Sequence, residues 1–237
     1  MATSIEINNL SKRYGYAYAL KSVTLETIHG EVVGLLGPNG SGKTTLLKVL
    51  ATLTAPTSGD VKEYGLDLRK NSRAIRRMVG YVPHTPLLYK DLTGEENIRF
   101  FSNFYSFSSK GDLQKRLDRT FNLFGITRWR HEPVKTLSSG LWKRFDLARA
   151  IIHDPQILLL DEPFTGLDVV SVKTVHDFIR DVRRNKTVIL STHNFNQARQ
   201  LCDRVVILVE GKIGQQLRGS DISEASVKGI FERGSSI

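Results

Sequence analysis

The sequence has almost no cysteine: Cys202 is the single one among 237 residues. No disulfide can therefore form within the chain, which is typical of proteins that fold in a reducing, cytosolic compartment. Cys202 itself is expected to be a small, buried or half-buried side chain.

Long apolar runs are missing as well. No stretch approaches the roughly 20 consecutive apolar residues that a membrane-spanning helix requires. The first residues, 1–6, lack the basic start and apolar segment of a signal peptide. There is also no internal repeat and no low-complexity segment. We therefore expect a chain that does not span a membrane by itself.

Acidic residues are too few to balance the basic ones: 24 Asp and Glu stand against 34 Lys and Arg, a net charge of +10. Nucleic acid, anionic lipid headgroups and a polyanionic ligand such as a nucleotide would each account for this excess. The basic residues form short clusters, such as 73–77 and 180–186, and no long block. A solvated surface with a basic bias is an equally open interpretation.

The strongest motif is a glycine loop between an apolar run, residues 32–36, and a helical-looking segment. Gly37, Gly42, Lys43 and Thr44 fit the spacing G-x-x-x-x-G-K-[ST] of a phosphate-binding loop. Glycines let successive backbone N–H groups face one anion, and the helix that follows adds the positive end of its dipole. Lys43 would bring a cation to the outer phosphates, and Thr44 would offer a hydroxyl to Mg²⁺.

Apolar runs that alternate with helical segments predict an α/β fold with a mostly parallel sheet. Residues 157–160 and 205–208 are apolar at every position, and 187–190 are apolar after Thr187, as in strands that are buried on both faces. Ligands gather at the carboxyl ends of such strands, where the glycine loop, residues 161–162 and residues 191–193 all lie. After residue 211 we expect only a short tail, with one helix over 223–231.

Short strands are also expected at 5–10 and 21–28, with three tyrosines between or beside them. Tyr14, Tyr16 and Tyr18 could stack on the face of a base. They could equally be strand residues that pack on the core, and the residues alone leave both interpretations open.

Residues 91–125 interrupt the alternation with a helical insertion. Thr93 and Glu96 have the spacing of a capping box. Aromatic and apolar residues then recur at helical spacing, which favours a stripe packed in the core: Ile98, Phe101, Phe104 and Tyr105. A second amphipathic helix over 113–124 is expected to end at Gly125.

Three polar side chains at strand ends complete a site for phosphoryl transfer to water, which needs a phosphate cradle, a metal and a water-positioning group. Asp161 follows a buried strand and fits as the carboxylate that holds Mg²⁺ together with Thr44. Glu162 follows directly, points a different way and suits a general base for water. His193, at the end of another apolar strand, could bond to the γ-phosphate or to the water.

Together these residues resemble the nucleotide-binding subunit of an ATP-binding cassette (ABC) transporter along almost the whole chain. Matching segments occur in the family's order: the phosphate loop, the signature-like residues 137–140, the Walker B strand 157–162, the D-loop 165–168 and the switch residue His193. The resemblance implies a P-loop NTPase (RecA-like) core with a small antiparallel β subdomain and an inserted helical subdomain. It also implies one domain over 1–237. Its β subdomain and core would occupy about 1–90 and 153–215, its helical subdomain about 91–152, and its tail 216–237.

The family's site residues carry over position by position. In such proteins two subunits close head to tail around two ATP molecules with Mg²⁺. The phosphates would be held by the loop residues Gly37, Pro38, Asn39, Gly40, Ser41, Gly42, Lys43, Thr44 and Thr45. Tyr14 would stack on adenine, and Glu162 would be the catalytic base. Asp168 would contact the partner subunit, and His193 would sense the γ-phosphate. Ser138, Ser139 and Gly140 would reach the ATP bound by the opposite subunit, because a serine and glycine at a helix N-terminus favour an anion.

Two positions depart from the family pattern. The signature usually reads L-S-G-G-Q, whereas Ser139 replaces the first glycine here and Leu141 the glutamine. We expect Ser139 to tolerate a tight backbone less well than glycine. His84 stands where the family usually has a glutamine that touches Mg²⁺ and the attacking water. A neutral imidazole can also ligate a metal or bond to water, and a tolerated replacement with slower hydrolysis is the alternative.

The resemblance implies an ATPase that powers a membrane transporter, with a second copy of itself or a homologous subunit, and an integral membrane subunit, as partners. Residues 84–93 and 164–168 are similar to ATPases of the cytochrome c-biogenesis haem-exporter group and to general drug and lipid exporters. We therefore expect an exporter subunit, peripheral on the cytoplasmic face of the membrane, with no nucleic acid bound. The alternative is a soluble cassette ATPase that acts on nucleic acid or ribosomes. A small-molecule kinase, which shares the phosphate loop, is disfavoured by the signature and by Glu162.

Overall fold

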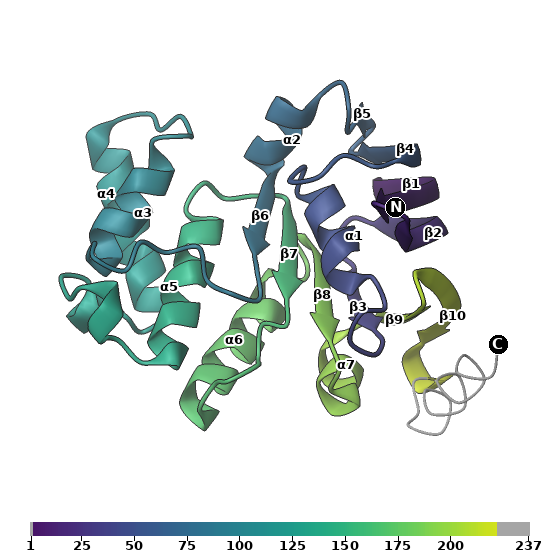
Figure 1. Cartoon of the computed structure of the whole chain (residues 1–237). Coiled ribbons are helices and arrows are strands. Elements are labelled where there is room, and N and C mark those ends of the chain that lie inside the picture. The colour runs from purple at the N-terminus through teal and green to yellow at the C-terminus, as the bar shows by residue number, and fades with distance from the viewer. Residues whose placement is uncertain (1, 222–237) are drawn as a thin grey trace.

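The larger of two sheets organises the chain in the computed structural model, which describes residues 2–221 (Figure 1). Its six strands lie in the order β10-β9-β3-β8-β7-β6, all parallel except β10, which runs antiparallel to β9. The strands are β3 (Val32–Leu36), β6 (Val79–Val82), β7 (Ile157–Asp161), β8 (Thr187–Thr192), β9 (Arg204–Val209) and β10 (Lys212–Arg218). Every residue of β3, β6, β7 and β8 is buried, which confirms the prediction of a mostly parallel sheet covered on both faces.

A second, antiparallel sheet has the order β2-β1-β4-β5. It consists of β1 (Thr3–Tyr14), β2 (Ala17–Ile28), β4 (Ser58–Glu63) and β5 (Leu66–Asp67). The β1–β2 hairpin extends well beyond the predicted strands 5–10 and 21–28. Register shifts bend it along its length, and Asn9 and Ser22 adopt left-handed backbone.

The hairpin tip exposes the three tyrosines. Tyr16 is fully exposed, and Tyr14 and Tyr18 are each 49% exposed. The interpretation that they pack on the core is therefore wrong, because the hairpin projects beyond the body of the sheet that it joins.

Helices cover both faces of the larger sheet (Figure 1). On one side α1 (Lys43–Leu50) lies in a core shared with the antiparallel sheet, and α2 (Ser72–Met78) leads into β6. On the other side a second core includes residues of α3 (Gly94–Ser102), α4 (Lys110–Leu123), α5 (Ser139–Ile151), α6 (Val169–Val182) and α7 (Phe195–Leu201). Three short 3₁₀ turns connect elements: η1 (Thr127–Trp129), η2 (Val134–Thr136) and η3 (Gly219–Asp221).

The insertion after β6 agrees with the sequence prediction only in part. Thr93 caps α3 with the predicted capping box, and α4 ends beside Gly125, which has φ +61°. The prediction of a stripe packed in the core is confirmed for Ile98, which is buried, and wrong for Phe104, which is 66% exposed, while Phe101 and Tyr105 are half-buried. The reason is that α3 ends at Ser102, so the helical spacing does not continue to Phe104.

The end of the chain contains a strand that the sequence did not predict. β10 pairs with β9 at the edge of the larger sheet. The helix expected over 223–231 lies outside the described residues. Within residues 2–221, every helix is too short or too polar to cross a bilayer.

Glu63 gives the antiparallel sheet a pH-dependent stability. Its side chain is fully buried, both carboxyl oxygens are without a hydrogen-bond partner among residues 2–221, and burial raises its pKa from 4.5 to about 8. The folded chain therefore holds this proton more tightly than the unfolded chain. Its stabilising contribution is complete below pH 4.5 and is lost as the pH rises toward 8.

We expect Glu63→Gln, which stays neutral, to match the wild type near pH 4.5 and to exceed it by a few kcal/mol at pH 8. Urea unfolding at several pH values measures this difference. Glu26→Gln, on the exposed face of β2, is the control and is expected to show no such trend. A stability difference that stays constant with pH would contradict the assignment.

Candidate active site

A cavity of about 720 Å³ opens beside the phosphate loop, at the carboxyl ends of the parallel strands. The predicted convergence of the loop with the ends of β7 and β8 is present. The cavity is lined by Ala19, Asn39, Gly40, Ser41, Gly42, Lys43, Thr44, Thr45, His84, Glu162, Thr165 and His193.

A larger cavity, of about 1190 Å³, lies at the β2–β3 turn and the end of α6. It contains none of the predicted site residues. Arginines and acids line it together, and one such pair, Arg183 and Asp203, is joined by an ion pair. The phosphate loop makes the smaller cavity the candidate active site.

The loop backbone has the shape that the glycine spacing predicts. Gly42 has φ +109°, and a Cβ there would lie 2.6 Å from the carbonyl oxygen of Ala19, so no other residue fits. Lys43 begins α1, is 6% exposed, and donates from Nζ to the carbonyls of Gly37 (2.7 Å) and Pro38 (3.0 Å). Burial lowers the pKa of Lys43, while the nearby charges of Glu162 and Asp161 oppose that shift. The cation is thus held inside the loop, where phosphate oxygens would replace the carbonyls.

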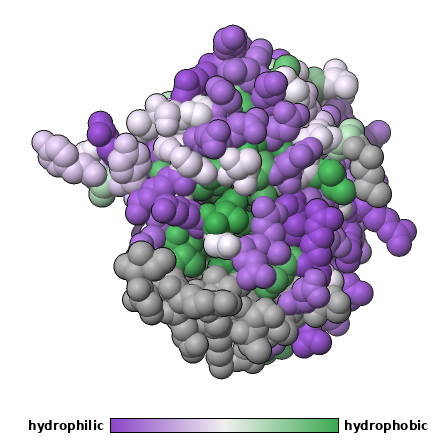
Figure 2. All heavy atoms as spheres, turned by 90° about the vertical axis from the view of Figure 1, so that its right-hand side faces the viewer, coloured by the Kyte–Doolittle hydropathy of each residue, from purple (hydrophilic) through white to green (hydrophobic). Residues whose placement is uncertain are grey.

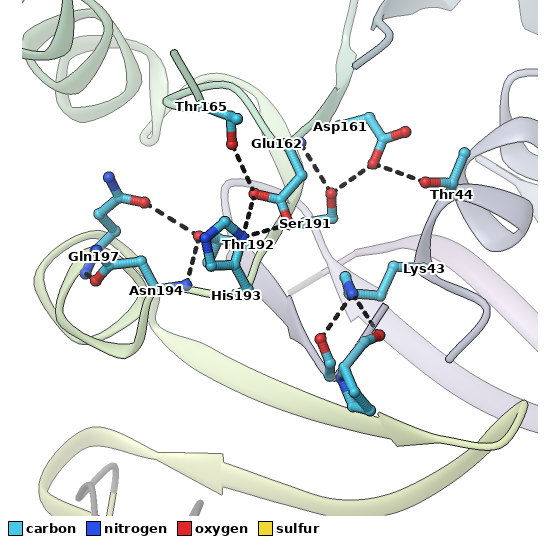
Figure 3. Close-up of polar contacts among 12 residues, drawn as sticks. Lys43, Thr44, Asp161, Glu162, Thr165, Ser191, Thr192, His193, Asn194 and Gln197 are labelled. Carbon is cyan, nitrogen blue, oxygen red and sulfur yellow. Dashed lines mark hydrogen bonds and ion pairs between the residues drawn. The ribbon is translucent and has the colours of Figure 1, made fainter. Parts of the chain in front are cut away.

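The oxygens around Asp161 fit Mg²⁺ (Figure 3). Thr44 Oγ1 donates to Asp161 Oδ1 (3.1 Å), and Ser191 Oγ donates to the same atom (2.6 Å). Asp161 is 1% exposed, and its Oδ2 is without a hydrogen-bond partner among residues 2–221. Residues 2–221 contain no cluster of three or more His, Cys, Asp or Glu side chains that could hold a metal ion. Mg²⁺ takes one or two protein ligands and completes its shell with water and phosphate oxygens, and the adjacent oxygens of Asp161 and Thr44 could supply those ligands.

Glu162 is held in an unusual conformation at the end of β7. Its φ is +49°, a region that costs a non-glycine residue free energy and that concentrates at functional sites. Its N–H donates to Ser191 Oγ (2.9 Å), and Thr165 Oγ1 donates to its Oε2 (3.2 Å). His193 Nδ1 lies 3.1 Å from the same Oε2. These contacts direct the carboxylate into the cavity, away from that of Asp161 (Figure 3).

His193 is positioned by the turn between β8 and α7 (Figure 3). Thr192 Oγ1 donates to Gln197 Oε1 (3.1 Å) and accepts from the N–H of Asn194 (3.0 Å). Asn194 in turn caps α7. The imidazole remains largely exposed, 65%, so it can reach a ligand in the cavity.

His84 lines the cavity from the loop after β6, opposite the phosphate loop. Its role as a metal ligand or water contact remains a prediction. His84→Gln keeps a neutral polar group at this position, so we expect the ATPase rate to stay the same or to rise. Phosphate release under saturating ATP measures this rate. A complete loss of turnover would instead show a role that only histidine can fill.

The signature residues lie outside this cavity and contact the D-loop of their own chain. Ser138 caps α5, and Ser139 Oγ donates to the carbonyl of Gly166 (3.0 Å). A Cβ on Gly140 would lie 2.5 Å from Ser171 Oγ, so a larger residue there would have to displace side chains at the start of α6. Ser139 occupies the first turn of α5 and is not among the residues with positive φ, which makes the expectation of a strained backbone at Ser139 wrong.

Asp168 has a structural role that the sequence did not suggest. Its Oδ1 accepts from the N–H of Ser171 (2.7 Å), which caps α6 and lowers the pKa of the carboxyl. Its predicted contact with a partner subunit stays a prediction, as does the stacking of adenine on Tyr14. Tyr14 is not among the cavity residues, although Ala19 brings the same hairpin to the cavity wall.

Two residues that the sequence left without a role, Ser191 and Thr165, hold the carboxylates of Asp161 and Glu162 in place. Ser191 Oγ bonds to Asp161 and also to the backbone of Glu162, and Thr165 bonds to the Glu162 carboxylate. The available signal was that Ser191 follows an apolar run, and so lies at a strand end beside Asp161. The register Asp161↔Ser191 is what turns that position into a contact.

Comparisons with known proteins agree with this site. Residues 20–165 match a family model described as ABC transporter. The chain is 35% identical over 230 residues to YdbJ of Bacillus subtilis, an uncharacterized ABC transporter ATP-binding protein, covering 96% of this chain and 73% of that one. It is 30% identical over 226 residues to the bacitracin transport ATP-binding protein BcrA of Enterococcus faecalis, covering 94% and 72%.

Solved structures give the same result. The ATP-binding subunit of an ABC transporter is 28% identical, covers 98% of this chain and 100% of its own, and has a TM-score of 0.87. A dimeric ATP-binding cassette in a post-hydrolysis state, bound to ADP and Pi, is 28% identical, covers 90% and 98%, and has a TM-score of 0.84.

Proposed function

The chain belongs to the ABC transporter ATP-binding family, and we propose that it is the subunit whose ATP hydrolysis powers a membrane exporter. As an ABC ATPase it binds ATP and hydrolyses it. The observation that carries the proposal is the cavity that the phosphate loop and Glu162 line together, with Asp161 bonded to Thr44 beside it. The proposed pairing is head to tail, with a second copy or a homologous subunit.

Different residues in and beside the cavity would serve different steps of ATP hydrolysis. The loop N–H groups and Lys43 hold the phosphates, and Thr44 and Asp161 would hold Mg²⁺, which neutralises charge that develops on the phosphoryl group. Glu162 accepts a proton from the attacking water. Its contact with His193 holds the imidazole beside the position that the γ-phosphate would occupy. Water is thereby activated beside the phosphate that it attacks.

Pairing of two cassettes would complete each site. Ser138 and Gly140 lie outside the cavity of their own chain, at the N-terminus of a 13-residue helix that favours an anion. In a head-to-tail dimer they would contact the γ-phosphate held by the partner. ATP would then be part of the interface, and its hydrolysis would release the pair.

An exposed aromatic patch suits the membrane partner. It consists of Tyr89, Phe100 and Phe104, which are 52%, 40% and 66% exposed. The ring of Phe100 packs edge-on against those of Tyr89 and Phe104, with distances of 5.2 Å and 5.7 Å between ring centroids. Such patches mark interaction sites. By contrast, the face over the antiparallel sheet and β10 is mostly hydrophilic (Figure 2).

Tyr89 of this patch belongs to the loop after β6 that also carries His84. A partner bound at the patch would therefore contact a loop that contributes a residue to the active-site cavity. Docking at this patch would hold the chain on the cytoplasmic face of a membrane. The transport named for BcrA supports a role of this kind.

Purification of the tagged full chain from membranes in mild detergent tests the proposal. We expect a polytopic membrane protein to accompany the wild type, and less of it to accompany Phe104→Ser. Lys62→Ser, on the exposed face of β4, is the control. Co-purification of nucleic acid or ribosomes in place of a membrane protein would support the soluble alternative and overturn this one.

A further inference from the structure

We propose that three charged residues of α5, Lys143, Asp146 and Arg149, act as positioning residues that lock His84 to the signature helix. We call these three residues the α5 latch. The part of the proposal that concerns two ATP sites rests on the proposed head-to-tail pairing.

The latch binds the backbone of the segment that carries His84. Lys143 Nζ donates to the carbonyl of Pro83 (2.9 Å), directly before His84. The N–H of Leu87 donates to Asp146 Oδ1 (3.3 Å). Arg149 Nη2 donates to the carbonyl of Tyr81 (2.6 Å). Since the bonds are made to the main chain on both sides of His84, they fix where this residue enters the cavity.

The three residues also form one unit on the helix. They are spaced three apart, so they follow one side of α5. Arg149 Nε donates to Asp146 Oδ1 (2.7 Å), which therefore accepts from both the helix and the loop. A shift of α5 along its axis would move all three contacts together.

Burial makes these charges costly, which argues that they are not there for packing alone. Lys143 is 4% exposed, Asp146 is fully buried, and the Arg149 side chain is 10% exposed. Burial lowers the pKa of Lys143. A buried charge group of this kind often contributes less stability than apolar residues of the same size. Asp146 Oδ2 even has no hydrogen-bond partner among residues 2–221.

The latch connects two different ATP sites in the proposed dimer. α5 begins at the signature, one turn before Lys143, and a helix transmits displacement as a rigid rod. Ser138 and Gly140 would contact the partner's ATP, whereas His84 lines the cavity of its own chain. Engagement of the signature would therefore set the position of His84, and the two sites would hydrolyse ATP cooperatively.

Lys143→Met tests the latch, because methionine keeps the length and apolar contacts but cannot donate to Pro83. We expect the kcat for ATP to fall about 10-fold, since small misplacements in an active site reduce rate strongly. The Kd for an ATP analogue should change less than about twofold, because the phosphate loop is untouched, and the Hill coefficient should fall toward 1. Lys143→Arg should recover much of the kcat, and Lys62→Met should match the wild type.

Two further measurements separate positioning from a loss of folding. Thermal unfolding of Lys143→Met should show one cooperative transition well above the assay temperature, with a Tm somewhat below that of the wild type, because the carbonyl of Pro83 loses its donor. Amide hydrogen exchange should be faster at Leu87 and unchanged in β3. The latch is overturned if Lys143→Met keeps the wild-type kcat, or if its Kd weakens as much as its kcat falls. Turnover without cooperativity in the wild type would contradict the coupling of two sites through the latch, whereas the kcat of the variant would still test whether the latch positions His84. The ATP-dependent mass of Glu162→Gln tests the head-to-tail pairing separately.

Discussion

Glu162→Gln is expected to stop ATP turnover while ATP binding is retained. The amide has the size of the carboxylate and can still face Thr165 and His193, but it cannot accept a proton from water. Loss of a general base lowers turnover by roughly 100-fold to 10,000-fold. The Kd for ATP should remain close to the wild-type value, because Lys43 and the loop N–H groups are unchanged. Phosphate release and calorimetric titration measure the two quantities.

Glu26→Gln is the matched control for this substitution, since it removes one carboxylate from an exposed strand position. It should leave both turnover and affinity unchanged. Wild-type turnover in Glu162→Gln would remove Glu162 from the role of base. A parallel loss of ATP binding would mean instead that the substitution disturbs the cavity as a whole.

Lys43→Ala is expected to abolish detectable nucleotide binding. Among residues 2–221, Lys43 is the one lysine that lines the cavity. Its ammonium group is held by two loop carbonyls, at 2.7 and 3.0 Å, where the outer phosphates would lie. Charge-assisted hydrogen bonds each contribute about 1.5 to 3 kcal/mol, so losing two weakens affinity by on the order of 100-fold to 10,000-fold. Calorimetry or a fluorescent ATP analogue measures this loss.

Lys48→Ala, on the exposed side of the same helix, provides the control. It removes an equal charge from α1 and should bind ATP as the wild type does. An unchanged Tm of Lys43→Ala would show that the fold is intact. Retained ATP affinity in a folded Lys43→Ala would contradict the proposed phosphate cradle.

The sequence predicts the frame of this site well because short-range patterns determine it. The apolar runs identify β7 and β8, and the spacing of Gly37, Gly42 and Lys43 identifies the loop between β3 and α1. A strand buried on both faces and a left-handed glycine each produce a recognisable pattern within a few consecutive residues. The strands of the larger sheet and the position of the cavity can be predicted from these local patterns.

Contacts between side chains that are far apart in the sequence produce no such local pattern. Ser191 bonds to Asp161 from 30 positions away, and this depends on the register between β7 and β8. The exposure of Phe104 depends on where α3 ends, and its helical spacing gave the wrong answer. The latch contact from Lys143 to Pro83, 60 positions apart, likewise required the structure.

The mass of Glu162→Gln in solution, with and without ATP, tests most directly whether ATP joins two copies of this chain. Sedimentation should show a monomer without nucleotide and a stable dimer when ATP and Mg²⁺ are present, because the trapped ATP cannot be hydrolysed. The double variant Lys43→Ala/Glu162→Gln, which lacks the cradle, should stay monomeric under both conditions. A Glu162→Gln chain that binds ATP and remains a monomer would contradict the proposed interface.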